Sequence, residues 1–105
     1  MTQYADLPLD IDPEVVAETA RMLRCLGHPV RLAILDHLDR SGESSVTEIH
    51  EALGIAQAVC SQHLGLLHDR GALARRRDGV NVLYAIEDER ARKVLACLRS
   101  QGDAS

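Results

Sequence analysis

Apolar residues recur at the spacing of an α-helix over the first part of the chain, and start and stop signals bound each helical stretch. Asp12 can cap a helix that begins at Pro13, because Asp is a favoured N-cap and Pro fits the first helical position. This first helix is predicted to run to about Leu26. Pro29 begins a second helix, which ends at residues 40–42.

Two further helical stretches follow, each ended by a glycine. Ser45 and Glu48 have the spacing of a capping box, which predicts a short third helix that Gly54 ends. A fourth helix is predicted over residues 57–70. Two helices joined by a tight turn that contains glycine are typical of a helix-turn-helix.

After the fourth helix the apolar pattern changes from helical spacing to alternation. One strand is predicted over residues 73–77, and the turn signal Asp78-Gly79 leads into a second strand. The alternating apolar residues of the second strand are Val82, Tyr84 and Ile86. Asp88 then begins a last helix, in which apolar residues return to helical spacing.

Composition supports a helical core. The chain has two Tyr and no Phe or Trp, so aliphatic residues must fill the core, which favours packed helices over a large sheet. The element order predicts a mainly α fold with a small β-hairpin, a winged helix-turn-helix. We expect one such domain over residues 12–100, with a flexible acidic arm at residues 1–11 and a flexible tail at residues 101–105.

The net charge of −4 argues against a nucleic-acid partner, but the charges are unevenly distributed. Residues 1–20 contain Asp and Glu and no Lys or Arg, whereas residues 70–77 contain four Arg and no acid. An acidic end can coexist with a basic face that binds DNA, so the total charge does not decide the partner.

The fourth predicted helix has an apolar side and a polar side. The apolar side should pack inward and consists of Cys60, Leu64 and Leu67, with Val59 beside them. The polar side lies near the N-terminal end and consists of Gln57, Ala58, Ser61 and Gln62. A recognition helix meets base edges there, and Gln and Ser both bond to bases. A merely solvated surface is the alternative, but the capped helix before it and the basic hairpin after it favour DNA binding.

The hairpin carries a second candidate DNA contact. Alternation places Arg75 and Arg77 on one face of the first strand and Arg76 on the other. Arg77 lies beside the turn and is the best candidate to reach a phosphate or the minor groove, with Arg75 on the same face. The alternative is a solvated edge strand that its charges protect from pairing.

Four stretches together resemble the ArsR/SmtB family of winged-helix repressors: residues 26–35, 45–49, 57–64 and 76–84. Within the third, Ser-Gln-His-Leu is typical of the family's recognition helix, which adds His63 to the candidate DNA-binding residues. The resemblance implies a homodimer that represses transcription and releases DNA when an effector binds. Two-fold symmetry then predicts an inverted-repeat operator, read by helices about 34 Å apart. The first and last helices are the candidate dimer interface.

The family's metal sites are absent from this sequence. One needs a cysteine pair where residues 45–47 read Ser-Val-Thr, and the other keeps Asp88 but has Arg90, Gln101 and Ala104 at its remaining positions. Zinc prefers about four N, S or O donors, so we expect no metal or other bound cofactor at either site.

Of the three cysteines, two remain as candidates for sensing an effector, Cys25 and Cys97. Cys60 is predicted to be a small core residue. Persulfide-sensing members of the family carry one cysteine in the second helix and one at the end of the last helix. This chain does not reproduce that cysteine pair, because Asp36 fills the first position and Cys97 lies too early for the second. Cys25 is predicted on a mostly polar side of the first helix, and nearby cations would make such thiols more reactive. If the first and last helices pair, Cys25 and Cys97 could form a redox, persulfide or metalloid switch; two unrelated structural cysteines are the alternative.

Three functions stay open at this point: a repressor that responds to an effector, a DNA-binding protein without an effector, and a protein-interaction module on the same fold. An enzyme is not expected, because the sequence has no nucleophile–base set and no phosphate-binding glycine loop. Unpaired cysteines and the lack of a membrane-length apolar run predict a protein of the cytoplasm.

Overall fold

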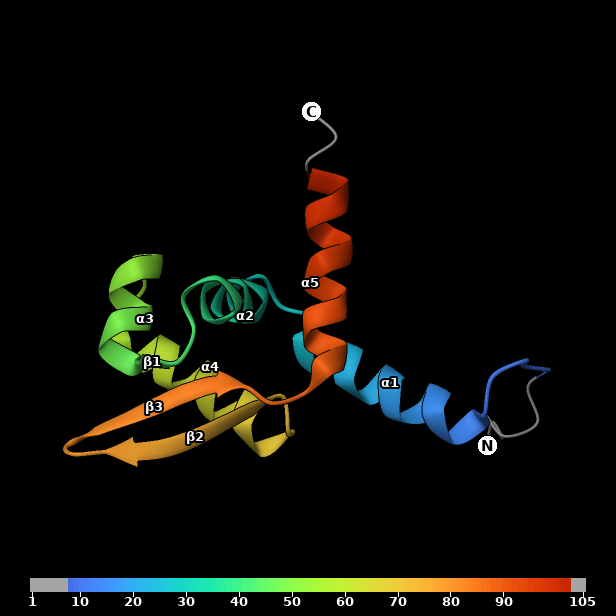
Figure 1. The fold of residues 1–105 in the computed structure, drawn as a ribbon, viewed down its shortest axis with the longest axis horizontal. Helices are drawn as coiled ribbons and strands as arrows, with labels where there is room; N and C mark the ends of the chain where they lie inside the picture. The colour runs from blue at the N-terminus through green and yellow to red at the C-terminus, as the bar shows by residue number, and fades with distance from the viewer. Residues whose placement is uncertain (1–7, 103–105) are drawn as a thin grey trace.

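The computed structural model describes residues 8–102, and its elements follow the predicted order (Figure 1). They are α1 (Pro13–Leu26), α2 (Pro29–Ser41), β1 (Ser44–Ser45), α3 (Val46–Leu53), α4 (Gln57–Asp69), β2 (Leu73–Asp78), β3 (Asn81–Ile86) and α5 (Glu89–Gly102). The N-terminal part of α1 and the β2–β3 hairpin extend to opposite sides of the molecule, with α5 between them (Figure 1).

The predicted arm and tail fall mostly outside the described residues. Residues 8–11 form neither helix nor strand, and residues 1–7 and 103–105 are not described. At the other end, α5 continues to Gly102, two residues into the segment that was predicted to be a tail. The end of α5 is polar and has no apolar residues at helical spacing. Helical periodicity therefore predicts an end of the helix that is too early.

Side chains cap the first three helices. Asp12 and His28 each accept a hydrogen bond from the backbone N–H two residues further on, at 2.9 and 3.1 Å. Ser45 and Glu48 make both bonds of the capping box at the start of α3. Gly54 ends α3 with a φ of 67°, a left-handed conformation that glycine adopts without strain.

The sheet has three antiparallel strands in the order β1-β3-β2, and the hairpin is its larger part. β2 and β3 pair from Leu73–Ile86 to Asp78–Asn81, which leaves a two-residue turn whose first residue, Gly79, has a φ of 64°. The strand β1 was not predicted, because two serines show no alternation of apolar residues. It pairs with β3 and ties the segment before α3 to the hairpin.

The core is aliphatic, as composition requires, and α4 lies against most of it. α4 packs on α1, α2, α3 and β2. The buried side chains are Met22, Cys25 and Leu26 of α1; Ile34, Leu35 and Leu38 of α2; Ile49 of α3; Cys60, Leu64 and Leu67 of α4; Ala72, Leu73, Tyr84 and Ile86 in and beside the sheet; and Ala91 and Leu95 of α5.

A small polar cluster fastens α4 to the junction of α1 and α2. The rings of His28 and His63 lie with their centroids 4.6 Å apart. Arg31 donates from Nε to Nδ1 of His63 at 3.3 Å and from Nη1 to the backbone oxygen of Cys25 at 2.9 Å. Partial burial, and then the neighbouring His28 and Arg31, lower the pKa of His63.

This cluster predicts that stability falls in mild acid. Above about pH 6.5 the ring is neutral in both the folded and the unfolded chain. As the pH falls below that value, the unfolded chain takes up a proton that folded His63 resists, so the free energy of unfolding decreases.

The variant His63→Gln tests the prediction by urea denaturation between about pH 7 and pH 5. Its side-chain oxygen can still accept from Arg31, but it does not titrate. We expect its stability to fall less with acidification than that of the wild type. Equal pH slopes in the two proteins would contradict the assignment.

Candidate nucleic-acid interface

The N-terminal half of α4 presents a polar edge to solvent, as predicted. Its four residues, Gln57, Ala58, Ser61 and Gln62, are all exposed. The opposite side of the helix is buried, and Cys60, Leu64 and Leu67 have no exposed surface. Because the buried side fixes the rotation of α4, the polar edge has a single orientation relative to the body.

Val59 does not pack inward as predicted, since 40% of its surface is exposed. It precedes Cys60 by one residue, and one residue turns an α-helix by about 100°, which carries Val59 away from the buried side.

The first turn of α4 has no side-chain cap. Its N-cap residue is Ala56, which offers no oxygen to the backbone N–H groups of the first turn. Uncapped N–H groups and the positive end of the helix dipole favour an anion at this end. Ser61 and Gln62 lie one turn further along the same exposed edge.

His63, the fifth α4 residue predicted at the interface, differs from its neighbours in exposure. It is half-buried, and its Nδ1 accepts from Arg31. Its contacts therefore hold α4 against the α1–α2 junction.

The hairpin separates its arginines as alternation predicts. In the strand register Arg75 lies opposite Tyr84 and Arg77 opposite Val82, so the two share one face of the sheet, while Arg76 lies opposite Leu83 on the other. Arg75 and Arg77 are exposed. Of the three, only Arg76 forms an ion pair within residues 8–102.

Arg76 is bound to Glu43, a pairing that the sequence did not reveal. Its Nε and Nη2 atoms donate to the two carboxylate oxygens of Glu43, both at 2.7 Å. These bonds from Arg76 lower the pKa of Glu43. Glu43 lies 33 residues earlier, just before β1, and only the pairing of β1 with β3 brings it to the hairpin. The bidentate pair neutralises Arg76 and braces the hairpin against the body.

The two candidate sensor cysteines differ in exposure. Cys25 is buried, with 3% of its surface exposed, and not on a polar side of α1 as predicted. Burial raises its pKa, and the nearby Arg31 and Arg70 offset this only in part. Cys97 is exposed on α5, and Cys60 is a buried core thiol as predicted.

No cluster of three or more His, Cys, Asp or Glu able to hold a metal ion occurs within residues 8–102. Among the same residues no helix is both long enough and apolar enough to cross a membrane.

Comparison with known proteins agrees with this geometry. A sequence model described as a helix-turn-helix domain matches residues 26–76, from the end of α1 into β2. The transcriptional regulator YgaV of Escherichia coli strain K12 is 31% identical over 100 residues, which cover 95% of this chain and 96% of that protein.

Solved structures extend the likeness to the whole fold. The transcriptional repressor BigR of Xylella fastidiosa superposes with a TM-score of 0.80 at 33% identity, covering 88% of this chain and 93% of that one. The antimony-specific repressor AntR gives 0.79 at 30% identity, covering 95% and 92%. The homodimeric winged helix-turn-helix domain of Mb0332 from Mycobacterium bovis, described as a possible ArsR-family regulator, gives 0.72 at 28% identity, covering 98% and 91%.

Identity of about a third over nearly the full length of YgaV, and the same fold as these repressors, agree with the four sequence stretches that suggested the family. The chain is therefore a DNA-binding transcriptional regulator and not an enzyme, and it belongs to the ArsR/SmtB family of winged helix-turn-helix repressors, which act as homodimers.

Proposed function

We propose that the polar edge of α4 enters the major groove and reads base edges. The observation that carries this proposal is a helix whose one side is fully buried while its other side exposes Gln57, Ser61 and Gln62. Gln can bond adenine through both atoms of its amide, and the methyl group of Ala58 suits contact with thymine. The uncapped N–H groups that follow Ala56 would hold a phosphate at the groove edge.

Arg77 and Arg75 supply the second contact, from the hairpin. Both are exposed and lie on one face of β2, whereas Arg76 is already occupied by Glu43. Arg77 is next to the last residue of β2 and so stands nearest the turn. Contacts of this kind to phosphates position a protein on DNA without reading its sequence.

The homodimer requires an apolar surface, and α1 and α5 offer one. Val15 and Leu23 on α1 and Leu98 on α5 are each about half exposed, at 49%, 48% and 47%. Leu23 also lines a shallow groove between the two helices, together with Val94. Burying these side chains against a second copy would place the two α4 helices on an inverted repeat, about 34 Å apart.

The proposal also includes the release of DNA when an effector binds. This would take place in the cytoplasm, where the operator lies. One neighbour in fold is a repressor specific for antimony, a thiophilic element. Cys97 is an exposed free thiol on a proposed dimer helix, whereas Cys25 is buried and its raised pKa disfavours the reactive thiolate. Cys97 is therefore the residue we expect to react first.

Selection of binding sites from a random duplex pool tests the DNA proposal. We expect the wild type to recover an inverted repeat. Gln62→Ala should then weaken binding to that repeat by about 1–3 kcal/mol and relax the preference at one base pair of each half-site. Failure of the wild type to recover any repeat at low salt would contradict the proposal.

Arginine variants of the hairpin provide the matched contrast. Arg77→Gln should weaken binding to all duplexes alike and reduce the slope of log affinity against log salt by about one per protomer. Arg76→Gln removes the same charge on the opposite face and should change this slope less, because Glu43 already neutralises Arg76.

The dimer interface is tested by Leu23→Glu in sedimentation experiments. A carboxylate there would have to be buried without a partner, so the equilibrium should shift from dimer to monomer. Val80→Glu is the control, since Val80 is 93% exposed at the hairpin turn and should leave the dimer intact. A dimer equally stable in both variants would place the interface elsewhere.

The thiol proposal is tested by mobility shift after treatment with arsenite or polysulfide. The wild type should release DNA, and Cys97→Ser should stay bound. Cys25→Ser provides the comparison for the buried thiol. A response that survives in both variants would exclude a cysteine switch built from this pair.

A further inference from the structure

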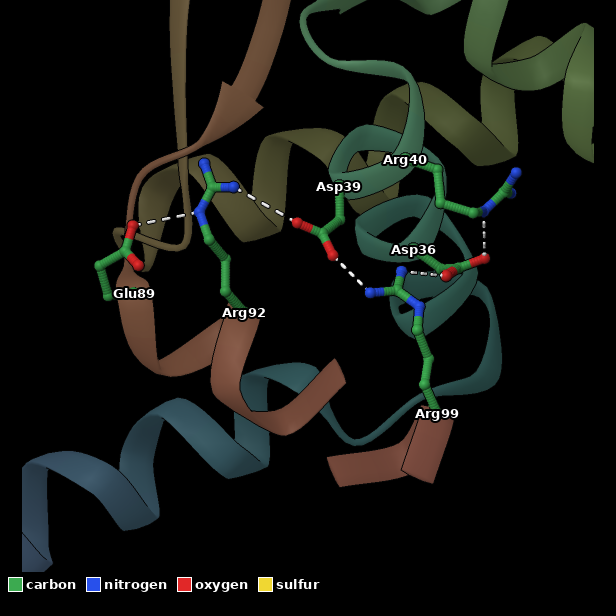
Figure 2. Close-up of polar contacts among 6 residues, drawn as sticks. All are labelled: Asp36, Asp39, Arg40, Glu89, Arg92 and Arg99. Carbon is green, nitrogen blue, oxygen red and sulfur yellow. Dashed lines mark hydrogen bonds and ion pairs between the residues drawn. The ribbon is translucent and has the colours of Figure 1, made fainter. Parts of the chain in front are cut away.

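A network of ion pairs joins α5 to α2 across the outside of the fold (Figure 2). Arg99 of α5 donates to carboxylate oxygens of both Asp36 and Asp39, the latter at 2.5 Å. Arg92, two turns earlier on α5, reaches the other oxygen of Asp39 at 3.3 Å. Asp39 thus receives one arginine on each oxygen, and Arg99 bridges two acids on successive turns of α2.

Arg99 has an unusual place at the end of α5. Of residues 96–102 it is the only one that is not exposed. The buried contacts of α5 lie earlier in the helix, at Ala91 and Leu95. Of residues 96–102 Arg99 is also the one that forms ion pairs with α2.

The helix α2, which holds the two acids, also contacts α4, the proposed DNA-reading helix. It packs on α3 and α4 as well as on α5, and its buried side chains are Ile34, Leu35 and Leu38. Asp36 and Asp39 lie on the other side of α2 and point toward α5 (Figure 2). A change in the angle between α5 and α2 therefore alters the position of α4 relative to α5.

We propose that Asp36, Asp39, Arg92 and Arg99 are positioning residues for DNA binding: they set the angle of α5 on the body and thereby the separation of the two α4 helices in the dimer. The inference rests on the proposed function in one respect, namely that α5 contributes to the dimer interface. None of the four residues lies on α4 or on the hairpin. Their effect on DNA binding would be geometric.

The sign of the effect distinguishes this role from simple electrostatics. Removing a carboxylate makes the protein less negative, which by itself strengthens attraction to DNA. A positioning role predicts the opposite, because a misplaced pair of α4 helices cannot bind both half-sites together. The loss should be specific to the inverted repeat with its selected spacing.

The test uses Asp39→Asn and two duplexes: the inverted repeat that the wild type selects, and the same half-sites moved apart. The wild type should bind the first far better. Asp39→Asn should lose roughly tenfold in affinity for the first and little for the second, so its spacing preference is reduced. Sedimentation and urea unfolding check that the variant remains a folded dimer.

Asp69→Asn is the matched control, since it removes the same charge from an exposed position at the end of α4. It should bind both duplexes at least as well as the wild type. In the double variant Asp39→Asn/Arg99→Gln the loss should be smaller than the sum of the two single losses, because both changes remove the same Arg99–Asp39 contact. If Asp39→Asn does not fold, Arg99→Lys replaces it. This variant keeps the positive charge, but a single ammonium cannot reproduce the planar guanidinium that bridges Asp36 and Asp39. Its preference for the selected spacing should also fall.

Two outcomes overturn the inference, and they differ. If the wild type selects a repeat and Asp39→Asn, or Arg99→Lys in its place, binds with unchanged affinity and spacing preference, the positioning role is wrong and the proposed function stands. If the wild type selects no repeat, the proposed function fails and the inference fails with it.

Discussion

Burial of one side of α4 is the constraint on which the rest of the molecule depends. Cys60, Leu64 and Leu67 have no exposed surface, and α4 packs on three helices and a strand. A helix held in this way cannot rotate without exposing apolar surface, which costs about 25 cal/mol per Å². The polar edge is consequently presented in one orientation, and the His63–Arg31 contact fixes the same helix at the α1–α2 junction.

The arginines of this fold have two roles, which depend on whether a carboxylate is paired with them. Arg76 and Arg99 are held by acids from distant parts of the chain and act as braces, one for the hairpin and one for α5. Arg75 and Arg77 have no such partner within residues 8–102 and stay open to phosphate. The negative total charge is thus compatible with DNA binding, because several of the acids are paired with arginines that are not among the proposed DNA contacts.

Local signals were sufficient to predict the helices, because caps such as Asp12 and Ser45 act within one turn. The same holds for the polar edge of α4, which follows from helical period alone. Contacts between distant segments could not be predicted in this way: Glu43 with Arg76, β1 with β3, and the α2–α5 ion pairs all depend on tertiary arrangement. Cys25 was misplaced for a related reason, since its burial is produced by packing on elements that its own helix does not specify.

Hydroxyl-radical footprinting of the wild-type dimer on its selected duplex tests the central claim most directly, because it reports where the backbone is covered without any substitution in the protein. Two α4 helices in adjacent major grooves, each flanked by a hairpin, predict two protected stretches on each strand. These should be related by two-fold symmetry and centred about one helical turn apart. A single protected stretch, or protection without symmetry, would contradict the account of a dimer that reads an inverted repeat through α4.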